Sequence, residues 1–286
     1  PPRAPQGRRG ADGAAGAGRL TQRRLRARLA YDGGAFDGWQ RQPGRRTVQG
    51  VLEAALHEIT GESARVVGAG RTDTGVHATG QVVHVDIDWK DTPRALRRAW
   101  NAVLARDVAV RSLGVAPDGF HARHSATSRR YRYVVWCHPV RHPLLRRTSL
   151  HVAVPLDVDA MADAAARLLG SRDFAAFGRA VGHSPITVRR LDRLDVVARG
   201  PRVELRFEGN AFLRHQVRRT VGLLIDVGRG RWQPGVIDDV LAGRPGAPVA
   251  WRAPAWGLTL TDVSYPGDDV IRSGARARAP EEGERR

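Results

Sequence analysis

Cysteine is almost absent from this chain: Cys137 is the only one among 286 residues. A single thiol excludes an internal disulfide and a zinc site built on several thiolates. No apolar run has the length of a membrane-spanning helix, and the N-terminus lacks the apolar segment of a signal peptide. These absences favour a protein of the reducing cytoplasm without a membrane partner.

Lysine is equally scarce, since Lys90 stands beside 46 arginines, yet the formal net charge is +18. Such an excess attracts polyanions over a long range and makes their binding salt-dependent. A compositional bias toward arginine would give the same charge on an ordinary solvated surface. Charge alone leaves both interpretations open.

The composition divides the chain into four parts. Residues 1–20 and 267–286 are poor in apolar side chains and are predicted to be disordered tails. Between them we expect an N-terminal α/β domain over 21–115 and a C-terminal α/β domain over 116–266.

Hydrophobic periodicity predicts the elements of both domains. In the first, strands over 25–31, 65–67, 83–87 and 108–110 alternate with helices over 48–59 and from 92. In the second, strands over 131–135, 187–197, 203–207 and 258–263 accompany helices over 157–168 and 212–227 and a short helix from 234. Each half has the order β-α-β-β-α-β. The predicted fold is α+β, with two ferredoxin-like halves whose antiparallel sheets flank a central basic active-site cleft.

A glycine-rich loop between two predicted strands carries the first candidate site. It runs over 68–77 and contains Asp73, two residues after Arg71. A nearby guanidinium keeps a carboxylate ionised and ready to act as a nucleophile or base. An Asx-turn with structural glycines is the plain alternative. The loop lacks the second carboxylate of a glycosidase and the helix that follows a dinucleotide fingerprint.

Two basic segments are further candidates. In 120–133, arginines including Arg123 and Arg130 surround Tyr131, a pattern that suits phosphate contact and base stacking. In the helix predicted over 212–227, Arg214 and Arg218 share a face and Arg219 follows. An amphipathic strand with core tyrosines and a solvent-exposed helix face remain the alternatives. The histidines do not have the spacing of a metal site, so no metal is expected.

Together these segments resemble the TruA family of tRNA pseudouridine synthases from about residue 25 to residue 266. The motifs that carry the resemblance are Tyr31-Asp32-Gly33, Phe36-Asp37-Gly38-Trp39-Gln40-Arg41-Gln42, Thr47-Val48-Gln49-Gly50, the loop over 70–77, the segment 120–133, Asp173-Phe174 with Phe177, the segment 212–218, and the segment 255–260 with Tyr265-Pro266.

The resemblance implies a role for several of these residues. Asp73 matches the family's nucleophile, and Arg71 matches an arginine that helps to expel the target base from the stem. Tyr131 matches a tyrosine that packs on the uracil and is a candidate for handling the C5 proton. Arg218 matches the arginine that pairs with the nucleophile. Predicted substrate-binding residues are Tyr131, Arg71, Arg123, Arg130, Arg214 and Arg219. His124, Gln216 and Arg219 depart from the family pattern, which affects fine substrate preference.

The resemblance also implies the reaction. Family members isomerise uridine to pseudouridine at positions 38, 39 and 40 of the tRNA anticodon stem-loop, after the base has been flipped out, and they act as homodimers. The reaction needs no redox step, so neither a cofactor nor a metal is expected. A non-catalytic protein that binds structured RNA is the main alternative, and a metal-dependent nuclease is disfavoured by the lone acid of the loop.

Overall fold

The computed structural model describes residues 23–180 and 185–268. The predicted tails therefore lie outside the described residues, except that Gly267 and Asp268 are described. Asp268 does not belong to a tail, because its carboxylate is 3.1 Å from the guanidinium of Arg26 and accepts a hydrogen bond from the backbone N–H of Tyr265.

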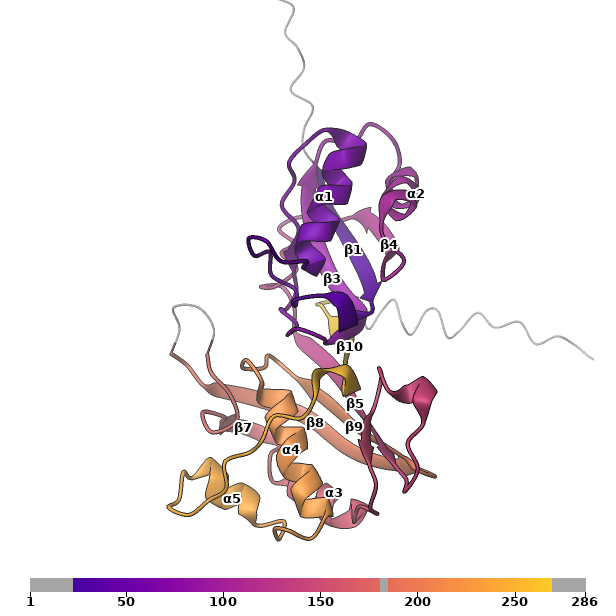
Figure 1. The fold of residues 1–286 in the computed structure, drawn as a ribbon. Coiled ribbons are helices and arrows are strands. Elements are labelled where there is room, and N and C mark those ends of the chain that lie inside the picture. The colour runs from indigo at the N-terminus through magenta and orange to yellow at the C-terminus, as the bar shows by residue number, and fades with distance from the viewer. Residues whose placement is uncertain (1–22, 181–184, 269–286) are drawn as a thin grey trace, which may run out of the picture.

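The described residues form a mixed α+β protein with one large sheet and few helices (Figure 1). The first half comprises β1 (Arg23–Tyr31), η1 (Gly33–Ala35), α1 (Val48–Thr60), β2 (Val67–Gly68), β3 (His77–Ile87), α2 (Pro93–Val103) and β4 (Val108–Val115). The second half comprises β5 (Ser128–Cys137), η2 (Pro143–Leu145), β6 (Leu150–Val152), α3 (Val158–Ala166), β7 (Gly170–Asp173), β8 (Val188–Arg199), β9 (Arg202–Gly209), α4 (Gln216–Gly228), α5 (Val236–Leu241), η3 (Ala255–Gly257) and β10 (Leu258–Ser264).

Local signals explain where the first two long helices begin and end. The Thr47 hydroxyl caps α1 by accepting from the backbone N–H of Gly50, and Gly61 ends this helix with a φ of 74°. Thr92 caps α2 in the same way, with Pro93 at its first position. The hydroxyl satisfies a free N–H of the first turn, and glycine adopts the left-handed conformation without a side-chain penalty. The predicted starts of both helices and the predicted end of α1 are confirmed.

The strands form one sheet instead of the two that the sequence predicts. Along the sheet the order is β4-β1-β3-β10-β5-β9-β8-β7, while β2 pairs with β3 and β6 with β5. The cause is β10, which runs antiparallel to β5 and parallel to β3 at Thr259 and Leu260. The last strand therefore joins the two halves through backbone hydrogen bonds.

Each half has a hydrophobic core between its strands and its helices. In Figure 1, α1 and α2 lie over the N-terminal strands, and α3 and α4 lie over the C-terminal ones. Trp100 and Leu29 are fully buried in the first core, and Phe174 and Phe177 are fully buried in the second. The side chain of Tyr131 contacts both cores.

Several predicted boundaries were wrong. The helix predicted from residue 212 begins at Gln216, because Arg214 forms an isolated β-bridge with Arg179 and His215 has a φ of 69°. Strand β3 begins at His77, and the short strands β6 and β7 were not predicted. Among the helices of the described residues, none combines the length and apolarity needed to span a membrane.

Candidate active site

The loop that carries Asp73 connects β2 to β3 and is fixed by its backbone. The carbonyl oxygen of Thr72 accepts from the N–H of Trp39 at 3.0 Å, and the N–H of Gly75 donates to Phe36 at 3.3 Å. The buried hydroxyl of Thr72 lies 2.9 Å from the hydroxyl of Tyr31. Burial raises the pKa of Tyr31 to about 12, against the effect of its hydrogen bond to Thr72. The loop is thus held in place on both sides of the aspartate.

Glycine allows the segment after β1 to approach this loop closely. A Cβ at Gly33 would lie 2.0 Å from the carbonyl oxygen of Val76. Gly38 has a φ of 87°, and a Cβ there would lie 2.9 Å from the oxygen of Thr72. Only a residue without a side chain fits these positions without strain. Both glycines belong to the motifs that the sequence analysis singled out.

Asp73 forms an ion pair with Arg218, which is the third residue of α4. The two side chains meet at 3.1 Å between Nη1 and Oδ2. The guanidinium also donates from Nε to the carbonyl oxygen of Ala253 at 2.7 Å. Its side chain is 10% exposed and that of Asp73 25% exposed. Burial lowers the pKa of Arg218 from its usual value, while the hydrogen bond to Asp73 raises it. The aspartate is therefore matched with a cation and still reachable from solvent.

Arg71 does not supply this cation. It is exposed, and within the described part of the chain its side chain makes no ion pair with Asp73, although it lies two residues away. The physical reason is the direction of the loop, which turns Asp73 toward α4 while Arg71 remains at the surface. The sequence-based idea that Arg71 holds the carboxylate is therefore wrong, and the partner is Arg218.

His215 is a site residue that the sequence analysis missed. Its Nε2 lies 3.6 Å from Oδ2 of Asp73 and 3.1 Å from Nη1 of Arg252. Burial lowers the pKa of this imidazole, against the opposing effect of Asp73. Among the described residues His215 is the only non-glycine with a positive φ, a conformation that costs roughly 1–2 kcal/mol. A strained backbone at a candidate site is a signal that only a structure provides.

Tyr131 lies on β5, half-buried between the two cores. Its ring meets that of Phe212 edge to face, with centroids 5.3 Å apart. Burial raises the pKa of Tyr131 above its usual range, and the charge of Asp73 contributes to the same shift. The phenol therefore keeps its proton at neutral pH, within electrostatic range of Asp73.

The remaining predicted arginines do not gather at Asp73. Arg123 and Arg214 are exposed. Arg130 is bound to Glu208 at 2.8 Å and Asp262 at 3.2 Å. Because successive side chains of a strand point to opposite faces, Arg130 lies on the other side of the sheet from Tyr131.

Arg219 follows Arg218 on α4, and its Nε is buried without a hydrogen-bond partner. Arg214 precedes the helix, so it does not share a helical face with Arg218 as predicted. No cluster of three or more potential metal ligands occurs in the part of the chain that the structure describes.

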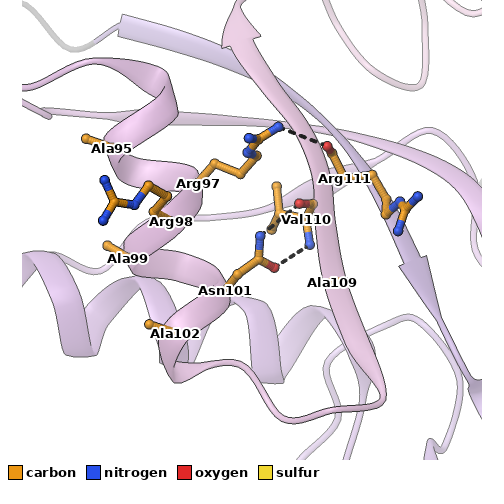
Figure 2. Close-up of a pocket in the computed structure, with 9 residues that line it drawn as sticks. All are labelled: Ala95, Arg97, Arg98, Ala99, Asn101, Ala102, Ala109, Val110 and Arg111. Carbon is orange, nitrogen blue, oxygen red and sulfur yellow. Dashed lines mark hydrogen bonds between the residues drawn. The ribbon is translucent and has the colours of Figure 1, made fainter.

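A cavity of about 980 Å³ lies elsewhere, between α2 and β4 (Figure 2). Its lining includes Arg97, Arg98 and Arg111 and contains no carboxylate, thiol or imidazole. The amide of Asn101 joins helix to strand through two hydrogen bonds with Val110, at 2.9 and 2.8 Å. This groove has no group for nucleophilic chemistry, although its guanidinium groups suit contact with phosphate.

Comparison with known proteins adds a second line of evidence. A family model described as tRNA pseudouridine synthase matches residues 27–125 and 164–266. A protein of Paraburkholderia phymatum named tRNA pseudouridine synthase A is 44% identical over 243 residues, which cover 85% of this chain and 91% of the relative. The protein of the same name in Burkholderia ambifaria is 44% identical over 248 residues, or 87% and 92% of the two chains.

Among solved structures, a chain of a Cbf5-Nop10-Gar1 complex is 12% identical and covers 70% of this chain and 54% of that one, with a TM-score of 0.30. So low a score carries no argument. The match of the family model over more than half of the chain, together with relatives at 44% identity along nearly their whole length, decides the family. The chain belongs to the tRNA pseudouridine synthases.

Proposed function

We propose that this protein isomerises uridine to pseudouridine at positions 38, 39 and 40 of the tRNA anticodon stem-loop, with Asp73 as the nucleophile. As a member of its family the protein is an isomerase that acts on tRNA. The observation that carries the assignment is the ion pair between Asp73 and Arg218. Asp73 stands on a loop whose backbone is hydrogen-bonded on both sides of it. A nucleophilic carboxylate must be ionised and reachable, and this one is paired with a cation and 25% exposed.

The reaction breaks the N1–C1′ bond and forms a C5–C1′ bond, while C5 loses a proton and N1 gains one. Asp73 acts by attack on the ribose, by attack on the uracil ring, or by promoting elimination. Electrons and atoms balance within the nucleotide, so the proposal includes no cofactor and no metal. The phenol of Tyr131, which keeps its proton at neutral pH, is proposed to pack on the uracil and to handle the C5 proton.

The target base must first leave the helical stack, at a cost of a few kcal/mol. The exposed guanidinium of Arg71, on the same loop as Asp73, is proposed to help expel it. Arg123, Arg214 and Arg219 are proposed to hold phosphates. Arg130 is the weakest member of the predicted set because two carboxylates already neutralise it.

The finer architecture belongs to the same proposal. Read from its last strand, each half has an equivalent strand order, β4-β1-β3-β2 in one and β10-β5-β9-β8 in the other. This order supports the proposal of two ferredoxin-like units, over 21–115 and 116–266. We further propose that a basic cleft lies between them, where Asp73 of the first half meets Arg218 of the second. We also propose a cytoplasmic homodimer in which one tRNA touches both subunits, and sedimentation with and without tRNA tests this assembly.

The decisive experiment uses unmodified tRNA that carries tritium at C5 of its uridines, with EDTA present. Wild type is expected to release tritium, and Asp73→Asn is expected to bind the same tRNA without release. Asp118→Asn, at an exposed aspartate between β4 and β5, is the matched control and should react like wild type. Transcripts with a single labelled uridine at 38, 39 or 40 assign the positions.

Three results would change the proposal. Tight binding without release by wild type would favour the non-catalytic RNA-binding protein. Equal release by wild type and Asp73→Asn would show that another residue is the nucleophile. RNA cleavage that stops with EDTA would revive the metal-dependent nuclease.

A further inference from the structure

We propose that Arg252, held by His215, binds a backbone phosphate of the RNA beside the target nucleotide. The inference rests on the proposed function for the identity of the RNA, and it assigns a binding role to two residues that the sequence analysis did not select. Its basis is the contact of 3.1 Å between Nη1 of Arg252 and Nε2 of His215.

The first step of the argument concerns charge. Arg252 is exposed, and no carboxylate of the described residues forms an ion pair with it. Arg218, in contrast, forms an ion pair with Asp73. A guanidinium that donates to a neutral imidazole keeps its full positive charge, whereas one that donates to a carboxylate is neutralised. Arg252 therefore has a charge to offer to an anion.

The second step concerns the state of His215. For the nitrogen Nε2 to accept from Arg252, the imidazole must be neutral, with its proton on Nδ1. Burial lowers the pKa of His215, and the nearby guanidinium groups of Arg252, Arg214 and Arg218 lower it further against the effect of Asp73. At 3.6 Å, Nε2 lies beyond hydrogen-bond distance from Asp73. The same nitrogen therefore lies close to both the guanidinium of Arg252 and the carboxylate of Asp73, but forms a hydrogen bond only with the guanidinium.

The third step concerns rigidity. Arg214 is bridged to Arg179 through both backbone groups, at 3.0 and 3.3 Å, which holds His215 in its left-handed conformation from the preceding residue. On the other side, Ala253 follows Arg252, and its backbone exchanges two hydrogen bonds with Arg218, at 3.0 and 2.7 Å. Both members of the pair are therefore attached to fixed backbone.

The fourth step concerns the ligand. A phosphodiester flanks every nucleoside of RNA on both sides, and guanidinium binds phosphate with good geometry. Nη1 of Arg252 and Oδ2 of Asp73 both lie near Nε2 of His215, at 3.1 and 3.6 Å, so the two side chains face the same small region. A nucleotide whose ribose or base reaches Asp73 would bring a flanking phosphate to this arginine.

The test measures RNA binding, so it does not depend on turnover. The probe is a fluorescent anticodon stem-loop with one uridine at position 39, and versions with a single uncharged methylphosphonate on the 5′ or 3′ side of that uridine. Arg252→Gln is expected to weaken binding of the unmodified RNA about tenfold and to reduce the slope of log K against log salt by about 1. Arg244→Gln, at an exposed arginine paired with Asp239, is the matched control and should bind like wild type.

A double-mutant cycle identifies the contact. One methylphosphonate should weaken binding to wild type about tenfold and leave binding to Arg252→Gln nearly unchanged. His215→Ala, checked for folding by its melting temperature, should lose part of the same coupling. Equal losses from each methylphosphonate in wild type and Arg252→Gln would overturn the proposal, as would an unchanged salt slope.

The outcome of this binding test is independent of the outcome of the tritium-release test of the proposed function. If wild type binds through Arg252 but makes no pseudouridine, the phosphate contact stands and the assignment of the reaction fails. If wild type releases tritium and Arg252→Gln binds normally, the reaction stands and the phosphate contact fails.

Discussion

The two-point contact of Arg218 gives a quantitative prediction for catalysis. Its guanidinium donates to Asp73 at 3.1 Å and to the backbone oxygen of Ala253 at 2.7 Å. In Arg218→Lys the charge remains, but one terminal nitrogen cannot occupy both positions. In Arg218→Met the side chain still fills the space, but the charge and both hydrogen bonds are lost.

The structure sets the size of each effect. A hydrogen bond to a charged group contributes about 1.5–3 kcal/mol, and the lower figure applies because the side chain of Asp73 is 25% exposed. Arg218→Lys should therefore lower kcat/KM about tenfold. The attraction between the two charges adds about 1–4 kcal/mol at this distance, depending on the effective dielectric constant. With about 1.5 kcal/mol for this partly solvated pair and about 1.5 kcal/mol for each of the two lost hydrogen bonds, Arg218→Met should lower kcat/KM roughly 2,000-fold.

The assay is the initial rate of tritium release at low tRNA concentration, with melting temperatures as a check on folding. Arg229→Met is the matched control, because Arg229 lies at the opposite end of α4 and is 3.9 Å from Asp226. Its rate should equal that of wild type. Equal losses in the lysine and methionine variants would refute the separate contribution of charge, and a wild-type rate for Arg218→Lys would refute the two-point contact.

Three further predictions concern the protein around the site. Burial lowers the pKa of His84 to about 4, so the stability that its neutral form contributes is present above about pH 6.5 and is lost as the pH falls toward 4. Urea unfolding should show that the free energy of unfolding falls between pH 7 and pH 5 by up to about 2 kcal/mol more in wild type than in His84→Asn. Gly33→Ala should destabilise the protein by about 1–3 kcal/mol, since its Cβ would overlap a carbonyl oxygen, whereas Gly70→Ala meets no atom within 4 Å and should change the melting temperature little. Replacing Arg98 and Arg111 by glutamine should weaken binding of full-length tRNA and lower the slope of log K against log salt by about 2. The affinity for the isolated stem-loop should not change. Equal weakening for both RNAs would show that the groove of Figure 2 is not a separate contact.

Local chemistry accounts for the parts of the fold that the sequence predicted well. Thr47, Gly61 and the pair Thr92-Pro93 act on the backbone within a few residues, so their effect can be read from the chain. Local signals did not predict the start of α4 correctly. Periodicity favoured a helix from residue 212, but a β-bridge to Arg179, 35 residues earlier in the chain, holds Arg214 in an extended form.

Contacts between residues far apart in the chain form the candidate site, and this explains why the sequence predicted only part of it. Asp73 and Arg218 are 145 residues apart, and no spacing rule joins them, so only the family resemblance paired them. His215 lay inside a recognised motif, but its importance comes from a φ of 69° and from the approach of Arg252, which belongs to another part of the chain. For Arg71, proximity in sequence suggested a contact that the direction of the loop prevents.

Strand β10 has a consequence for biosynthesis. Leu260 and Val263 complete the N-terminal core, and Leu258 contributes to the C-terminal one. On the ribosome, β4 is finished about 150 residues before β10, so part of β3 stays unpaired for roughly 10–30 s at ordinary elongation rates. His77, which follows the Asp73 loop, gains its partner Thr259 only at the end of this interval. A nascent chain therefore holds several of the arginines proposed to bind RNA before it holds a finished active site, and the site is completed only after β10 has been made.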